Sequence, residues 1–221
     1  MRDSKVVRVC AVLVILGACA AICLVKTGGF GPGIEPVLHR VTGSVLAQQA
    51  LGLLKPGGQI IVIARDTSVF KNPASDIQLA AFSKVLAKAN ATVGRSHLLQ
   101  LDPLRPLRVP SGDFLELIKS SSRESVIVSF MGPPLLEDAE RAQLTEVKPS
   151  IVAFCSGSLA QNVDLQSLFE QGLLKAAVVT RQNPAVQSFK PRDMRQCFDQ
   201  SYLLITPENL AALSVVSIAV P

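Results

Sequence analysis

Short runs of apolar, largely β-branched residues recur along the chain and constrain its fold more than any other feature. The clearest are Gln59–Arg65 (QIIVIAR), Ser125–Met131 (SVIVSFM) and Ser150–Cys155 (SIVAFC). Their apolar residues are continuous rather than alternating with polar ones, which is typical of strands covered on both faces. Such strands form parallel sheets with helices on either side, so these runs predict an α/β domain.

Segments with helical spacing separate these runs. The first, Pro36–Leu54, begins with a proline suited to a first helical turn and stops at Gly57-Gly58. We expect six strands with intervening helices, and therefore a three-layer, doubly wound, mostly parallel sheet. The other helices are expected over Pro73–Asn90 (capped by Asn72), Ser111–Lys119 (capped by Ser111), Asp138–Val147, Asp164–Gln171, Arg192–Phe198 and from Pro207, and the other strands over Leu98–Leu101, Leu174–Arg181 and Tyr202–Thr206.

The amino-terminal region carries a second constraint. Val9–Val25 is a run of seventeen residues without a charge, preceded by Arg2, Lys5 and Arg8 and followed by Lys26. As a helix it would span about 25 Å at about 1.5 Å per residue, close to the ~30 Å of a membrane hydrocarbon core. The excess of positive charge before the run predicts that residues 1–8 stay in the cytoplasm and that the rest lies outside it.

Three fates of this run stay open. A cleaved signal peptide would use Ala18-Cys19-Ala20 as its cleavage site, and a lipoprotein signal would be lipidated at Cys19. We favour a retained helix because Ala20–Val25 stays apolar beyond the cysteine. The expected order is then a cytoplasmic tail (1–8), a transmembrane signal-anchor (9–25), a linker (26–35) and an extracytoplasmic α/β domain (36–221) on the periplasmic face of a bacterial inner membrane.

Charge and aromatic content argue against nucleic acid as a partner. The chain has a net charge of +5, of which +3 lies in residues 1–26, so the domain itself is only weakly basic. It contains no tryptophan and one tyrosine, which leaves few side chains for stacking on bases.

Polar residues at the ends of the expected strands form the candidate ligand site. In open α/β sheets, ligands bind outside the carboxyl ends of the strands, near the point where the strand order reverses. Each polar residue at a strand end has a structural alternative: it can cap a helix, turn the chain or face solvent. We select these residues as a group because they are expected to share one edge of the sheet. The candidates are Asp66 and Thr67 after the first strand, Ser129 and Gly132 after the third, Ser156 after the fourth and Arg181 after the fifth.

Familiar catalytic patterns do not fit the chain. The turn after the first strand has no glycine, as a dinucleotide site would need, and no G-x-S-x-G motif occurs. Cys155 is the one candidate nucleophile, but its candidate base, His97, falls at the amino end of the strand expected at Leu98–Leu101, on the opposite edge. We therefore expect neither catalysis nor a cofactor, and an enzyme is the remoter alternative.

Cysteine spacing gives no metal site. Cys10, Cys19 and Cys23 lie in the apolar run, and outside it Cys155 and Cys197 occur without a C-x-x-C motif or clustered histidines. In an oxidising compartment Cys155 and Cys197 could form a disulfide, and otherwise both are buried thiols.

Four segments of the carboxyl half follow one another in the order strand, helix, strand and late strand-turn segment. They are Lys148–Phe154 (KPSIVAF), Leu165–Leu173 (LQSLFEQGL, with its Glu-x-Gly), Lys175–Val179 (KAAVV) and Tyr202–Leu210 (YLLITPENL). Together they resemble the carboxyl lobe of type 1 periplasmic binding proteins, the sugar-binding components of transporters. The resemblance covers about Ser125–Leu210 and implies the binding-protein fold and an extracytoplasmic location.

Three departures from that family concern its ligand. Its members have two lobes around a cleft, and this chain has the length of one lobe. Their sites commonly stack sugars on aromatic side chains, which this domain lacks in number. Cys155-Ser156 stands where the family usually has a ligand aspartate. The resemblance therefore implies the fold rather than sugar as the ligand.

The sequence favours a membrane-anchored, extracytoplasmic domain that binds or senses a small ligand. Its expected partners are the lipid bilayer, a small molecule and a second copy of the chain that would complete a two-lobed site. The alternative is a structural or interaction subunit of a membrane complex, and a lipoprotein or an enzyme of unknown chemistry comes third.

Overall fold

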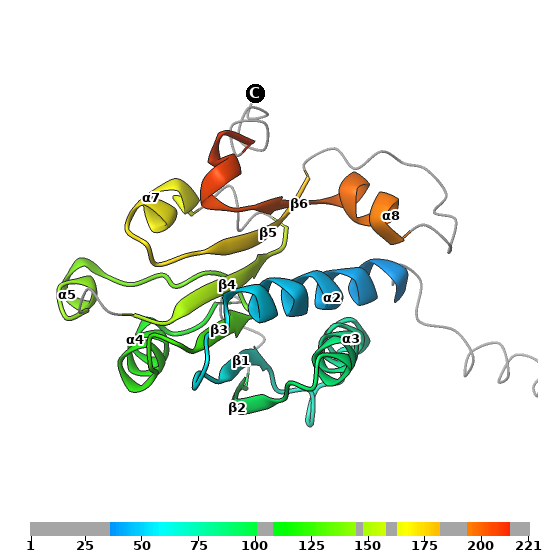
Figure 1. Cartoon of the computed structure of the whole chain (residues 1–221), viewed down its shortest axis with the longest axis horizontal. Helices are drawn as coiled ribbons and strands as arrows, with labels where there is room; N and C mark the ends of the chain where they lie inside the picture. Colours follow the sequence, from blue (N-terminus) through cyan, green and yellow to red (C-terminus); the bar gives the residue numbers. More distant parts are fainter. Residues whose placement is uncertain (1–35, 101–107, 145–147, 158–162, 182–193, 213–221) are drawn as a thin grey trace, which may run out of the picture. The chain divides into compact units, whose positions relative to one another are not determined.

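A computed structural model describes residues 36–100, 108–144, 148–157, 163–181 and 194–212 (Figure 1). The chain divides into two units, Met1–Ile34 and Glu35–Pro221, and all the described residues belong to the second. The expected transmembrane run 9–25, the linker 26–35 and Cys19 lie outside the described residues. Within the described ranges, no helix is both long enough and apolar enough to span a bilayer.

A six-stranded sheet lies at the centre of the domain, with the strand order β2-β1-β3-β4-β5-β6. Strands β1 to β5 are parallel, and β6 pairs with β5 in the antiparallel sense. The expected mostly parallel sheet of six strands is thus confirmed. The strands are β1 (Ile60–Arg65), β2 (Val93–Leu99), β3 (Val126–Ser129), β4 (Ser150–Cys155), β5 (Ala176–Thr180) and β6 (Tyr202–Ile205).

Helices cover both faces of this sheet, which confirms three layers (Figure 1). One face packs on α2 (Pro36–Leu53), α3 (Pro73–Lys88) and α8 (Met194–Ser201). The other packs on α4 (Ser111–Ser120) and α7 (Leu165–Glu170), with the short α5 (Asp138–Arg141) beside α4. A 3-10 helix, η1 (Pro207–Ala212), follows β6 where we expected a last helix.

The strands are continuously apolar because alternate residues enter two different cores. In β1, Ile60 and Val62 pack towards α2 and α3, whereas Ile61 and Ile63 pack towards α4 and α7. All four side chains are buried. Since successive residues of a strand point to opposite faces, a polar residue at any of these positions would be buried in one core or the other.

The expected N-cap residue is observed for α3 but not for α4. Asn72 caps α3, as expected, by accepting a hydrogen bond from the Ser75 N–H at 3.2 Å. Ser111 does not cap α4. Pro110 occupies the N-cap position without a side-chain hydrogen bond, so Ser111 is already the first helical residue.

Two expected elements differ most in extent. Strand β2 begins at Val93, five residues before the expected start at Leu98. It is an edge strand. Its exposed Gly94, Arg95 and Ser96 break the continuous apolar run that identifies the inner strands in the sequence. Helix α5 ends at Arg141 instead of continuing along the expected Asp138–Val147, of which residues 145–147 lie outside the described ranges.

Candidate functional site

The strand order reverses between β1 and β3, because β2 lies on one side of β1 and all later strands lie on the other. In doubly wound sheets this is where a ligand-binding crevice forms. Asp66 follows β1 and Phe130 follows β3 at the same edge, where the Phe130 N–H donates to the Ile63 carbonyl at 2.9 Å.

Asp66 and Thr67 form a hydrogen-bonded turn after β1. Asp66 Oδ1 accepts from the Ser68 N–H at 2.8 Å, and Thr67 Oγ1 donates to Asp76 Oδ1 in the first turn of α3 at 2.7 Å. The hydrogen bonds from Ser68, through its side chain and its backbone, hold the pKa of Asp66 below its usual value. Both side chains therefore stabilise the β1–α3 connection.

Ser129 and Gly132 shape the turn after β3. Ser129 is fully buried, and its Oγ accepts from the Met131 N–H at 3.2 Å. Gly132 has φ 98°, in the left-handed region that a side chain rarely adopts. A glycine at this position is thus explained by backbone geometry alone.

Ser156 and Arg181 lie further along the same edge. Ser156 is exposed directly after β4, and the next N–H, that of Gly157, donates to Thr180 Oγ1 at 3.2 Å. Arg181 follows β5, and its Nε donates to the Tyr202 carbonyl at 3.2 Å, which ties β5 to the start of β6. Arg181 also lines a hollow of about 690 Å³ between α2, α8 and β6.

The six predicted residues share one edge of the sheet without meeting in one cavity. Neighbouring strands are about 4.8 Å apart, so Asp66 after β1 and Arg181 after β5 are separated by three strand spacings, about 14 Å. Asp66, Ser129 and Gly132 flank the reversal point. Their polar groups are engaged in turns. Of the six residues, Arg181 lines the hollow between α2, α8 and β6, and none lines a second cavity, on the α4–α7 face of the sheet.

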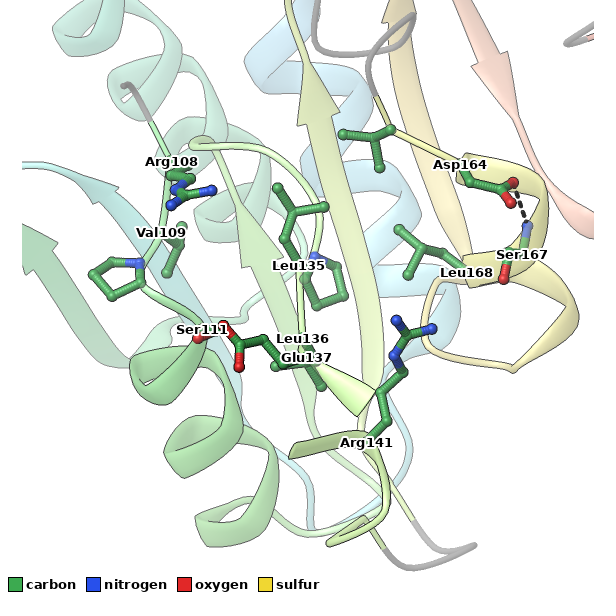
Figure 2. A pocket seen from close by; sticks show the side chains of 13 residues that line it. Arg108, Val109, Ser111, Leu135, Leu136, Glu137, Arg141, Asp164, Ser167 and Leu168 are labelled. Atoms are coloured by element: carbon green, nitrogen blue, oxygen red, sulfur yellow. Dashed lines mark hydrogen bonds between the residues drawn. The ribbon is translucent and has the colours of Figure 1, made fainter. Parts of the chain in front are cut away.

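A cavity of about 600 Å³ lies on the α4–α7 face of the sheet. Figure 2 shows it between the start of α4 and the start of α7, with the segment Pro134–Arg141 running between the two helices. The chain reaches α4 from β2 and α7 from β4, so these helix starts are the ends nearer the carboxyl edge. Its lining residues are Arg108, Val109, Pro110, Ser111, Pro134, Leu135, Leu136, Glu137, Arg141, Val163, Asp164, Ser167 and Leu168. We call it the α4–α7 cavity.

The two carboxylates of the α4–α7 cavity lie at helix starts. Asp164 Oδ1 accepts from the Ser167 N–H at 2.9 Å at the start of α7. Glu137 precedes α5, where its N–H donates to Glu140 Oε2 at 2.8 Å and its backbone carbonyl accepts from the Glu140 N–H at 3.0 Å. In Figure 2 the Glu137 carboxylate lies beside Ser111 at the start of α4.

The two arginines of the cavity are less fully bonded. Arg141 pairs with Asp138 at 3.0 Å and donates to Gln171 Oε1 at 3.4 Å, but its Nε is buried and has no acceptor among the described residues. Arg108 is exposed and has neither a hydrogen bond nor an ion pair to another described residue. In Figure 2 the Arg108 side chain lies on the α4 side and the Arg141 side chain on the α7 side.

These lining residues could not be selected from strand ends alone. Strand ends predict residues directly after each strand, whereas the α4–α7 cavity is built one layer further out, from helix starts and the segment after β3. One signal was present in the sequence. Asp164 marked the start of a helix, and polar residues at helix starts lie near the carboxyl edge whenever the helix follows a parallel strand.

Cys155 is unsuited to nucleophilic chemistry. It is fully buried in the core under α4 and α7, and burial raises the pKa of its thiol to about 12. His97 lies near the carboxyl end of β2, not at the amino end as expected, because β2 starts earlier. Its Nε2 is 3.1 Å from Asp113 Oδ2 in α4, and three strand spacings separate β2 from the β4 strand that ends in Cys155.

The candidate disulfide is not formed. Cys155 and Cys197 are both buried thiols. Cys155 belongs to the core on the α4–α7 face, whereas the α8 helix that carries Cys197 packs Phe198 on the opposite face. In the described part of the chain, no group of three or more His, Cys, Asp or Glu side chains is placed to hold a metal ion.

No protein-family model and no curated protein matches this sequence. Solved structures do match. A carbohydrate transporter solute-binding protein from Agrobacterium radiobacter, in complex with D-arabinose, is 12% identical, with 80% of this chain and 62% of that chain covered and a TM-score of 0.50. The periplasmic component of a sugar transport system from Hahella chejuensis is 14% identical, with 76% and 61% covered and a TM-score of 0.48.

A periplasmic ribose ABC transporter from Conexibacter woesei is 11% identical, with 64% of this chain and 45% of that chain covered and a TM-score of 0.42. This chain thus spans between 45% and 62% of the length of these three solved chains. The resemblance to periplasmic binding proteins is confirmed as a likeness of fold.

Proposed function

We propose that this protein is a membrane-anchored, extracytoplasmic domain that binds a small molecule in the α4–α7 cavity. The observation that carries the proposal is the cavity itself. Its volume of about 600 Å³ lies within the ~300–1,000 Å³ of small-molecule sites. It combines apolar walls with a few charged side chains, and a doubly wound sheet binds ligands towards the edge from which its helices start.

A cavity-filling substitution tests this proposal. Full-length protein in detergent is screened by thermal shift against sugars, including D-arabinose, amino acids, organic acids and nucleotides. Leu135 lines the cavity, so Leu135→Trp should abolish any ligand-induced rise in Tm by occupying the space. Val69→Trp is the matched control, because Val69 is 68% exposed in the β1–α3 loop, outside the cavity lining.

Two results would overturn small-molecule binding at this cavity. One is the absence of any stabilising compound across the library. The other is a rise in Tm that survives in Leu135→Trp, which would place the ligand elsewhere on the domain.

The membrane anchor is the second part of the proposal. Its support is the uncharged run Val9–Val25 with basic residues before it, which predicts a helix long enough to span and an amino terminus on the cytoplasmic side. Such an anchor would hold the binding domain at the outer surface of the membrane, on the periplasmic face in a bacterium.

A second candidate function is favoured by one observation. Val69 and Phe70 are adjacent, large and apolar, and they are 68% and 54% exposed. Exposed apolar side chains next to each other are typical of contacts with another protein. The domain would then be an interaction subunit of a membrane complex, and Phe70→Asp should reduce crosslinking to its neighbour in intact membranes while leaving Tm unchanged.

A further inference from the structure

We propose that the ligand of the α4–α7 cavity is a small organic acid, with its carboxylate between Arg108 and Arg141 and its apolar part against the leucines of the wall. This inference rests on the proposed function and names the chemical class of its ligand. It follows from the balance of used and unused polar groups around the cavity.

The negative side chains of the cavity lie at helix starts. Asp164 accepts the Ser167 N–H at the start of α7, and in Figure 2 the Glu137 carboxylate lies beside Ser111 at the start of α4. A helix start carries partial positive charge, which offsets part of each carboxylate's field. The cavity therefore does not offer these two carboxylates as free partners for a cationic ligand.

The positive side chains retain unused donors. Arg141 Nε is buried without an acceptor in the described part of the chain. A buried donor without an acceptor is rare in folded proteins and commonly marks the place of a missing partner. The ion pair of Arg141 with Asp138 is weak competition, because the Asp138 side chain is 96% exposed and water screens such pairs.

Arg108 supplies the second guanidinium. It makes no ion pair or hydrogen bond with another described residue, and it lines the cavity from the α4 side. Arginine presents a planar fork of N–H groups that matches the two oxygens of a carboxylate. Two arginines from separate segments, before α4 and in α5, thus line the same cavity from opposite sides.

The rest of the wall indicates an apolar body for the ligand. Val109, Leu135, Leu136, Val163 and Leu168 line it, and none of the thirteen lining residues is aromatic. A sugar site commonly offers aromatic faces and several hydrogen-bonding side chains, whereas aliphatic walls favour hydrocarbon. An acid with a hydrocarbon part fits both the arginines and these walls.

The test uses the full-length chain in detergent and isothermal titration calorimetry with four probes. These are 3-phenylpropionate, its uncharged amide 3-phenylpropionamide, inorganic phosphate and D-arabinose. We expect 3-phenylpropionate to bind about tenfold or more tightly than the amide, since a hydrogen bond to a charged group is roughly twice as strong as a neutral one. Binding should weaken as salt is added.

Matched variants assign the binding to the arginines. Arg108→Gln and Arg141→Gln should each weaken 3-phenylpropionate binding about tenfold, and Arg141→Lys should restore part of the loss because it keeps the charge without the fork. Arg123→Gln is the control. Arg123 lies just before β3, pairs with Glu124 and does not line the cavity, so its loss should leave the affinity unchanged. Unchanged Tm values in all variants would show that folding is preserved.

Each contrary result has one meaning. Equal binding of the amide, or binding of D-arabinose alone, would overturn the organic-acid inference and leave small-molecule binding standing. Binding of phosphate but not of 3-phenylpropionate would also overturn the organic-acid inference, because it would show that the site excludes a ligand with an apolar part. Binding of 3-phenylpropionate that Arg108→Gln and Arg141→Gln both leave unchanged would overturn the assignment to this cavity. No binding by any probe, with a silent thermal-shift library, would overturn both proposals.

Discussion

Cys155 illustrates how one buried residue can be both reactive by type and inert by position. It ends β4, at the edge where ligands bind in related sheets, yet it is fully buried beneath α4 and α7. Burial disfavours the thiolate, which raises the pKa from 9.0 to about 12. Because the thiolate is the nucleophile, the shift by itself reduces its population about a thousandfold in neutral solution.

We therefore predict that Cys155 resists alkylation in the native protein. At pH 8, iodoacetamide should leave the peptide that carries Cys155 unmodified over a time that fully labels it in urea. Peptide mass spectrometry reads the result separately for each cysteine. Because the pKa is raised, labelling should increase as the pH rises towards 12. Rapid labelling of folded protein at pH 8 would contradict the burial described for this residue.

At the scale of elements, helices α2 and α3 approach each other closely at one glycine. A Cβ atom placed on Gly43 would overlap the backbone carbonyl of Gln78 in α3. Further along the same helix, a Cβ on Gly52 would meet nothing. Replacing each of these two glycines of α2 with alanine should therefore have opposite effects on stability.

We predict that Gly43→Ala lowers the free energy of unfolding by about 1–3 kcal/mol, because the added methyl group must push two backbones apart. Gly52→Ala should raise it by about 0.5–1 kcal/mol, because alanine loses less backbone entropy in a helix. Urea titrations of the full-length variants, followed by far-UV circular dichroism, measure both. A stabilised Gly43→Ala would mean that α2 and α3 do not pack as described.

The inner strands could be predicted from the sequence because each is buried on both faces. Strands β1 and β3 contain few polar residues, and none of their residues is exposed. For the edge strand β2, the sequence predicts a start five residues after the observed one, because one side of this strand is not buried. Its exposed Arg95 and Ser96 are tolerated where one side of the strand meets water, so no apolar pattern marks them.

The candidate site was only partly accessible from the sequence. The edge of the sheet follows from strand direction, and Asp66, Ser129 and Arg181 do lie along it. Which side chains share a cavity depends on the path of the chain between elements. The segment Pro134–Arg141 runs between α4 and α7, and no periodicity in the sequence encodes that path.

At the scale of the whole molecule, the anchor proposed for the run Val9–Val25 would determine where the domain works. We predict that the full chain remains in the membrane pellet after alkaline carbonate extraction and that protease added to spheroplasts digests residues 36–221. A spanning helix anchors through about 20 apolar residues, which a high-pH wash does not remove. Intact mass and immunoblotting of the pellet measure the outcome.

A Cys19→Ser variant separates the three fates of that run. A retained helix keeps this variant in the pellet at full length, because Cys19 is then one of several small residues in an apolar segment. Release of the variant alone would assign the anchor to a lipid on Cys19. A shortened, extractable chain in both forms would assign the run to a cleaved signal peptide.

The strand order also governs how the chain can fold as it is made. β1 pairs with β2 on one edge and with β3 on the other, so its second edge stays open until residue 129 has been synthesised. Parallel pairings of this kind close long loops and form slowly. An unpaired strand edge of this kind can pair with other chains, which is how incompletely folded proteins aggregate. The inner position that buries β1 in the finished sheet thus leaves one of its edges unpaired until β3 has been made.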